Sequence, residues 1–104
     1  MLQFEIWQLK PTRHAKSMAK LVVVLQHPRL QDLDTTVVAP LRLMGELPGI
    51  GRLRPEVSVG RKRYRVIVDR LSVISQSALA KRIGSASDFS ESIKRATDEL
   101  LYGN

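Results

Sequence analysis

The stretch EVSVGRKRYRVIVDRLSVIS, residues 56–75, constrains the fold of this chain more than any other part. Val57 and Val59 alternate with polar neighbours, Gly60 follows them, and the alternation resumes at Tyr64. Apolar side chains at every second position are typical of a strand with one buried face, and a glycine between two such runs is typical of a hairpin turn. The sequence therefore predicts a β-hairpin, followed by a further short strand in LSVIS.

Three earlier stretches also predict strands. LQFEIWQLK places Phe4 and Ile6 on one face and Trp7 on the other, where we expect Trp7 to be a packing residue. AKLVVVLQ is rich in β-branched residues, which suits a central strand buried on both faces. TTVVAPLRLM is the third candidate, and Pro40 predicts a bulge or an edge position there because proline lacks a ladder donor.

The regions between and after these strands are less regular. GELPGIGRLRP holds three glycines and two prolines, which predicts a long loop. Its Gly-x-Gly lacks a third glycine and a following helix pattern, so a flexible loop is favoured over a phosphate cradle. QSALAKRIG fits a short helix or a connector, and its sequence does not decide between them.

The period of the apolar residues changes near the C-terminus and predicts a helix. They recur three or four positions apart, at Phe89, Ile93, Ala96 and Leu100. We expect Asp88 to be the N-cap, with Glu91 completing a capping box and also pairing with Arg95 one turn on. Gly103 is a plausible C-cap glycine. Asp98 and Glu99 oppose the helix dipole in the last turn, so this end is either screened by solvent or suited to a cationic partner.

The charge of the chain predicts acidic partners. Its 17 Lys and Arg residues against 10 Asp and Glu residues give a net charge of +7. The excess is densest in RKRYR, where four cations surround Tyr64. This cluster is either a solvated hairpin tip or a patch for phosphates or an acidic peptide.

The composition also excludes several classes of site. The chain has no cysteine, which excludes disulfides, thiolate zinc sites and cysteine nucleophiles. His14 and His27 lie beside predicted turns without a ligand constellation, so we expect no metal, no cofactor and no catalytic residue. A ribonuclease that uses arginine with serine or threonine shows no spacing motif, and that alternative stays open. We expect one domain, residues 1–104, in the cytoplasm, with no signal peptide and no membrane span.

The order of these segments resembles a known family. QFEIW, VVAPL, LRPEVSVG, Tyr64 and the terminal LLYGN follow one another as they do in CcdB, the toxin of a bacterial toxin–antitoxin pair. The resemblance covers nearly the whole chain and is weakest in PTRHAKSMAK and MGELPGIGR. It implies a mainly β fold with one C-terminal α-helix, an SH3-like small barrel of the CcdB type, assembled as a homodimer.

The resemblance also implies a function without catalysis. Family members bind the A subunit of DNA gyrase and trap the enzyme with its DNA cleaved, and a CcdA-like antitoxin with an acidic disordered tail releases them. Neither a membrane nor direct contact with nucleic acid is implied. The gyrase-binding residues carried over to this chain are Gln3, Phe4, Asp98, Leu101, Tyr102, Gly103 and Asn104. Nothing in the sequence assigns the antitoxin-binding residues.

The C-terminal tip departs from the family pattern. A tryptophan and an isoleucine are typical where this chain has Tyr102 and Asn104, and an amide is typical at Asp98. Tyrosine still stacks on guanidinium planes, although less strongly than tryptophan. Two alternatives therefore remain: a toxin of the same fold with another target, such as RNA, and a basic module that binds nucleic acid.

Overall fold

A computed structural model describes residues 2–11 and 20–103 of the chain. It contains seven strands and one α-helix within these residues, connected by loops and short 3-10 turns. The strands are β1 (Glu5–Leu9), β2 (Leu21–Val24), β3 (Thr35–Leu43), β4 (Glu56–Val59), β5 (Lys62–Val66), β6 (Ser72–Ser75) and β7 (Leu79–Ser85), and the helix is α1 (Ser90–Tyr102). This confirms the mainly β fold with one C-terminal helix.

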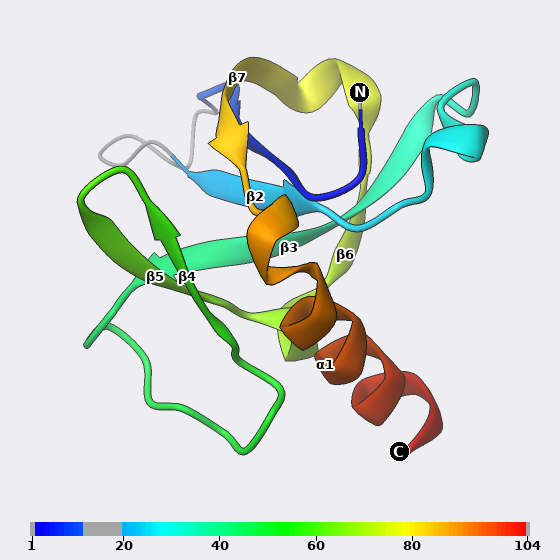
Figure 1. Cartoon of the computed structure of the whole chain (residues 1–104). Helices are drawn as coiled ribbons and strands as arrows, with labels where there is room; N and C mark the ends of the chain where they lie inside the picture. The colour runs from blue at the N-terminus through cyan, green and yellow to red at the C-terminus, as the bar shows by residue number, and fades with distance from the viewer. Residues whose placement is uncertain (1, 12–19, 104) are drawn as a thin grey trace.

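The strands form one antiparallel sheet that curls into a half-barrel, consistent with a small SH3-like barrel (Figure 1). Its order is β4-β5-β3-β2-β1-β7, and β6 pairs separately with β3. The predicted hairpin is confirmed: β4 and β5 pair up to Val59 and Lys62, and Gly60 in the turn has a φ of 61°. Positive φ is strained for side chains other than glycine, which explains the glycine at this turn.

Pro40 lies neither at an edge of the sheet nor at a bulge, contrary to the prediction. It pairs with Val22 in β2, and β3 is a central strand. On its other edge β3 pairs with β6 up to Val38 and with β5 from Leu41. The Pro40 carbonyl accepts from the Ile67 amide on that edge, between the two partner strands. Because the missing donor falls where β3 changes partner, proline costs the sheet no regular ladder bond.

The segment QSALAKRIG is a strand with a short 3-10 turn before it. Residues Gln76–Ala78 form the turn, and β7 then pairs with β1 along its length, with two register shifts. The other edge of β7 has no strand partner among the described residues. β4 ends the sheet on the opposite side, and a Cβ placed on Gly84 of β7 would lie 3.8 Å from Val59 of β4. The half-barrel thus has a seam, where β4 and β7 come close at Val59 and Gly84 without pairing among the described residues.

Helix α1 packs its N-terminal half on the sheet. Ile93 and Ala96 are fully buried in the main core cluster and Phe89 packs against it, as the periodicity predicts, but Leu100 is exposed. The predicted Asp88 cap with its Glu91 box is wrong. A 3-10 turn, Ser87–Phe89, precedes the helix, so Asp88 lies inside that turn and Phe89 takes the N-cap position without a side-chain hydrogen bond.

The interior has two clusters of buried apolar residues. The larger one lies between the sheet and α1 and includes Ile6, Val57 and Ile93. The smaller one contains Val22, Val24 and Val38, and Trp7 packs against it. Because neighbouring β2 residues belong to different clusters, β2 is buried on both faces, as predicted. Trp7 is confirmed as a packing residue.

Candidate partner-binding surfaces

The C-terminal end of α1 presents large apolar side chains to solvent. Leu101 is 57% exposed and Tyr102 is 72% exposed, and Leu100 precedes them on the same turn. Aromatic and large apolar residues that stand clear of the core are typical anchors of protein interfaces. We call Asp98, Leu101, Tyr102 and Gly103 the tip; Asn104 lies outside the described residues.

The tip has a fixed backbone. Gly103 adopts a left-handed conformation with a φ of 73°, and its amide donates to the Glu99 carbonyl at 3.0 Å. This confirms the predicted C-cap glycine. Asp98 is exposed and lies three and four positions before Leu101 and Tyr102, so the three side chains share one side of the helix. The tip therefore combines an aromatic ring, a leucine and a carboxylate.

The N-terminal pair of predicted site residues has a different role in the described chain. Phe4 is 7% exposed and belongs to the main core cluster. Its amide donates to the Val24 carbonyl at 2.7 Å, and its carbonyl accepts from the Ala86 amide at 2.7 Å. Gln3 donates from Nε2 to the Leu25 carbonyl at 2.9 Å. Both residues therefore fix the start of the chain to β2, and Phe4 offers a partner little side-chain surface.

The structure does not bring the two predicted groups together within one chain. Phe4 is hydrogen-bonded to Ala86, which lies just before the N-terminal end of α1. Tyr102 ends the same helix, and twelve residue steps of α-helix span about 18 Å. Figure 1 shows the segment leading into β1 far from the C-terminal end of α1.

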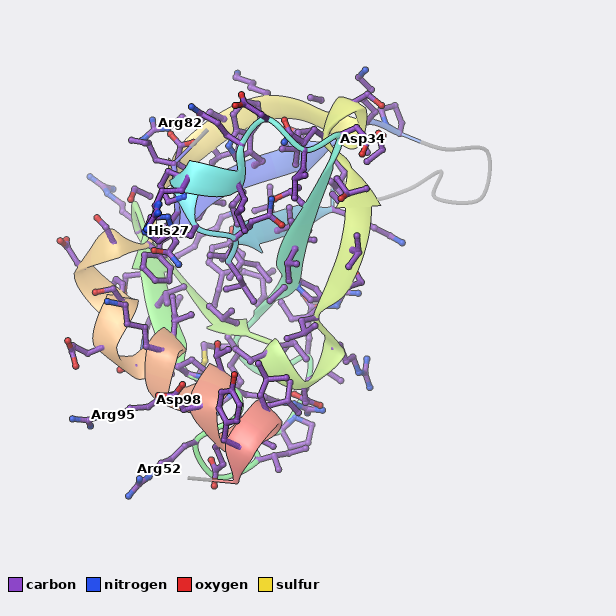
Figure 2. All side chains as sticks on the ribbon, turned by 90° about the vertical axis from the view of Figure 1, so that its right-hand side faces the viewer. His27, Asp34, Arg52, Arg82, Arg95 and Asp98 are labelled. Atoms are coloured by element: carbon purple, nitrogen blue, oxygen red, sulfur yellow. The ribbon has the colours of Figure 1, made fainter. Side chains whose placement is uncertain are left out.

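A second candidate surface is a cavity of about 330 Å³ between α1 and the segment before β4. Its lining residues are Arg52, Pro55, Glu56, Ser92 and Arg95, and we call it the cationic pocket. Figure 2 shows Arg52 and Arg95 reaching out from the same side of the molecule. Sequence reasoning missed this site because its two cations lie on elements that only the folded chain brings together.

The cations of RKRYR occupy the β4–β5 hairpin, as predicted. Arg61, Lys62 and Arg63 are exposed, whereas Arg65 is half-buried. Arg63 forms an ion pair with Glu56 across the hairpin. Arg65 donates from Nη1 to the Arg54 carbonyl at 3.3 Å and lies under the loop that follows β3. At the turn of the hairpin, Arg61 and Lys62 are thus exposed and belong to none of the ion pairs of the described residues. Arg65 instead contacts the loop.

The loop of residues 45–55 is held by a buried arginine that the sequence did not reveal. Arg54 donates to both carboxylate oxygens of Asp69, at 3.0 and 2.9 Å, and to the Pro48 carbonyl at 2.9 Å. The hydrogen bonds from Arg54 lower the pKa of Asp69, outweighing the burial that raises it. A charge-assisted bidentate pair of this kind fixes the loop that carries Arg52 into the cationic pocket.

A buried carboxylate, Glu5, anchors the start of the chain. Burial raises the pKa of Glu5, but hydrogen bonds from the Leu2 amide, Arg82 and Trp7 outweigh it, so that the pKa is lower than usual. Arg82 of β7 reaches Glu5 at 2.6 Å.

The three ion pairs of the described residues are thus those of Arg54, Arg63 and Arg82. The predicted pair between Glu91 and Arg95 is absent from them.

Metal chemistry finds no support in the described part of the chain. No group of three or more His, Asp or Glu side chains there is placed to hold a metal ion. His27 accepts the Arg29 amide at 3.1 Å and caps a 3-10 turn, while His14 lies outside the described residues. Among these same residues, no helix has the length and apolar character needed to cross a bilayer.

Comparison with protein families decides the relationship of the chain. The family model described as CcdB protein matches residues 3–103. The chain belongs to the CcdB family. It is therefore related to the toxins of toxin–antitoxin systems, as the order of its segments suggests. The comparison with curated proteins gives no match.

Solved structures of other toxins share this fold. The Mycobacterium tuberculosis toxin MazF-mt6 is 17% identical, with a TM-score of 0.74 over 93% of this chain and 95% of its own. An endoribonuclease from a mycobacterial species, solved in complex with its cognate antitoxin, is 13% identical, with a TM-score of 0.74 over 97% of this chain and 94% of its own. At such identities the likeness shows a shared fold and nothing of the target.

Proposed function

We propose that this CcdB-family toxin binds the A subunit of DNA gyrase through its tip and traps the enzyme with its DNA cleaved. The observation that carries the proposal is the exposure of Leu101 and Tyr102 above the glycine cap of α1. These residues occupy the positions that the family uses against gyrase. The family match over residues 3–103 supports the same target.

The chemistry of the tip defines the partner surface. Tyr102 offers a ring face for an arginine guanidinium, and Leu101 offers apolar area beside it. Asp98 adds a carboxylate one turn earlier, which favours a cationic partner and opposes the helix dipole less once it is paired. The matching surface on gyrase is therefore a basic site with an apolar margin.

The assembly and partners follow from this target. We propose a homodimer, as the family resemblance implies. Light scattering should then give twice the 11.7 kDa chain mass. We also propose a CcdA-like antitoxin whose acidic disordered tail meets the basic surface, and action in the bacterial cytoplasm by binding, without catalysis or a cofactor.

Purified gyrase tests the target directly. The wild-type chain should retain the gyrase A subunit in a pull-down and increase cleaved plasmid DNA in a gyrase reaction. Tyr102→Ala should weaken gyrase binding by about 30-fold, the loss of about 2 kcal/mol that an interface anchor gives. Tyr102→Phe should keep most of the affinity, because the ring face and not the hydroxyl makes the stacking contact.

A matched control separates the tip from exposed leucines in general. Leu33 is 49% exposed and lies away from α1, in the loop before β3. Leu33→Ala should leave gyrase binding unchanged, whereas Leu101→Ala should weaken it. If Tyr102→Ala stays fully toxic and binds gyrase as the wild type does, the tip is not the target-binding site and the proposal fails.

A ribonuclease activity is the second candidate function, favoured by the fold that the chain shares with an endoribonuclease toxin. Incubation with total and synthetic RNA tests it. Cleavage at defined sites, lost when a basic residue of the barrel is replaced, would displace gyrase as the target. Intact RNA together with accumulated cleaved DNA would support the gyrase assignment.

A further inference from the structure

The cationic pocket lies one to two turns before the tip on α1 and is lined by two arginines. Arg52 and Arg95 come from two different elements, with Ser92 beside them. Both side chains are exposed and reach outward from the same side of the molecule (Figure 2). Neither arginine takes part in the ion pairs of the described residues, so both are available to an anion.

The carboxylate of the pocket does not supply that anion. Glu56 lines the cavity, but it forms an ion pair with Arg63 across the β4–β5 hairpin. Its charge is therefore offset on the hairpin side, and the two arginines of the pocket stay available. Pro55 adds an apolar wall next to Glu56.

A line of cations leads away from the pocket along the hairpin. The register pairs Ser58 with Arg63 and Val59 with Lys62, so these two cations lie on opposite faces of the hairpin, and Lys62 is the nearer one to the turn at Arg61. Four strand residues cover about 13 Å, and all three cations are exposed. Exposed cations are thus present both at the pocket and at the turn of the hairpin beyond it.

We propose that the cationic pocket holds a phosphate of a single-stranded nucleic acid, with Arg61 and Lys62 contacting phosphates further along the strand. Guanidinium groups and a hydroxyl are the donors that phosphate oxygens accept from. The Pro55 wall gives the sugar an apolar contact. A cavity of about 330 Å³ lies within the range of small-molecule sites and is larger than one carboxylate needs.

This inference adds a ligand to the chain and does not depend on the gyrase proposal. It departs from the family resemblance, which implies no direct contact with nucleic acid. The surface carries only Tyr64 as an aromatic residue near the cations, and Tyr64 is partly buried against the core. Binding therefore rests on phosphates, is tolerant of sequence and is strongly dependent on salt.

Fluorescence anisotropy with a labelled single-stranded 12-mer tests the proposal. RNA and DNA forms of one mixed sequence are titrated with full-length protein at several KCl concentrations. The double variant R52Q/R95Q should lose at least about tenfold in affinity, and its salt slope should fall by about 1.4, the value for two lost phosphate contacts on a single strand. The unfolding midpoint of each variant reports whether it is folded.

The matched control removes two cations elsewhere. Lys20 and Arg29 are exposed and lie outside the pocket and the hairpin. K20Q/R29Q lowers the net charge equally, so it should lose less than about threefold in affinity and keep its salt slope. Equal losses in the two double variants would show a diffuse charge effect and overturn the pocket assignment.

A competing ligand gives the second arm of the test. A labelled glutamate-rich peptide of the same net charge is titrated against the same proteins. If the peptide binds more tightly than either oligonucleotide and R52Q/R95Q abolishes this difference, the pocket belongs to an acidic protein segment and the proposal is wrong. The gyrase pull-down of R52Q/R95Q is a separate readout, because the tip is intact in that variant.

Discussion

The carboxylate of Asp69 binds Arg54, the arginine that holds the loop of residues 45–55 in place. Two hydrogen bonds from Arg54 lower its pKa below the value of about 3.9 that an unfolded chain has. A group with a lowered folded pKa stabilises the protein fully above its unfolded pKa, and this contribution is lost as the pH falls through the folded pKa. Asp69→Asn should therefore lower the urea midpoint at about pH 7, and the gap to wild type should close as the pH falls through the lowered pKa of Asp69.

The control for this prediction is an exposed aspartate. Asp32→Asn, in the loop before β3, should leave the urea midpoint unchanged across the same pH range. A gap between Asp69→Asn and wild type that stays constant from neutral to acidic pH would contradict the ionic role of Asp69.

Gly103 sets the backbone of the tip, and its φ of 73° is costly for other residues. Gly103→Ala should destabilise the last turn of α1 by about 1 kcal/mol, because a left-handed conformation brings the Cβ close to the carbonyl. Gly103→Asn should cost less, since asparagine tolerates this conformation. Gyrase affinity should follow the same order, with Asn retaining more than Ala.

A glycine without a positive φ serves as the comparison. Gly84 in β7 has room for a Cβ at ordinary contact distance from Val59. Gly84→Ala should therefore be neutral or stabilise the fold by about 0.4–1 kcal/mol in thermal unfolding, through the unfolded chain. If Gly84→Ala destabilises the protein more than Gly103→Ala, backbone conformation does not govern these two sites.

At the scale of elements, Ile93 is the largest buried side chain that joins α1 to the sheet. Ile93 is fully buried in the main cluster, and Ile93→Ala should lower the free energy of unfolding by about 2–5 kcal/mol. Ile83 in β7 is 39% exposed, so Ile83→Ala should cost only about 0.5 kcal/mol. Similar losses for the two isoleucines in urea denaturation would contradict this placement of the core.

The elements differ in how well the sequence predicts them. The hairpin and α1 were predictable because their apolar residues follow a clear period, as in Val57, Val59 and Ile93. The strand β7 was not, because Ala80–Ile83 are all exposed and leave no alternation to read. Pairing with β1 forms that strand. The helix N-terminus was misassigned because a 3-10 turn shifts the cap by one residue, from Asp88 to Phe89.

The candidate sites divide in the same way. The tip residues Leu101 and Tyr102 were assigned from the family resemblance, and the structure shows that both are exposed. The cationic pocket and the Arg54–Asp69 pair could not, since their residues meet only through the tertiary fold. Phe4 shows the opposite case: a position tied to partner binding by resemblance is placed in the core by its two backbone hydrogen bonds.

At the scale of the whole molecule, the tip and the cationic pocket should act independently. Arg95 and Tyr102 are seven residues apart on one helix, about 10 Å. Variants that far apart usually add within about 0.5 kcal/mol. In the combination of R52Q/R95Q with Tyr102→Ala, the losses in gyrase and oligonucleotide binding should each match those of the parent variants. A coupling above about 1 kcal/mol would show that both ligands use one surface.

The seam between β4 and β7 has a consequence for how the molecule opens. Val59 lies close to Gly84 there, and no ladder joins the two strands in the described residues. The outward-facing amides of β7 should therefore exchange with deuterium through small, local fluctuations, well before the amides of β2 and β3. The sheet should thus open first at its free β7 edge, while its central strands stay hydrogen-bonded.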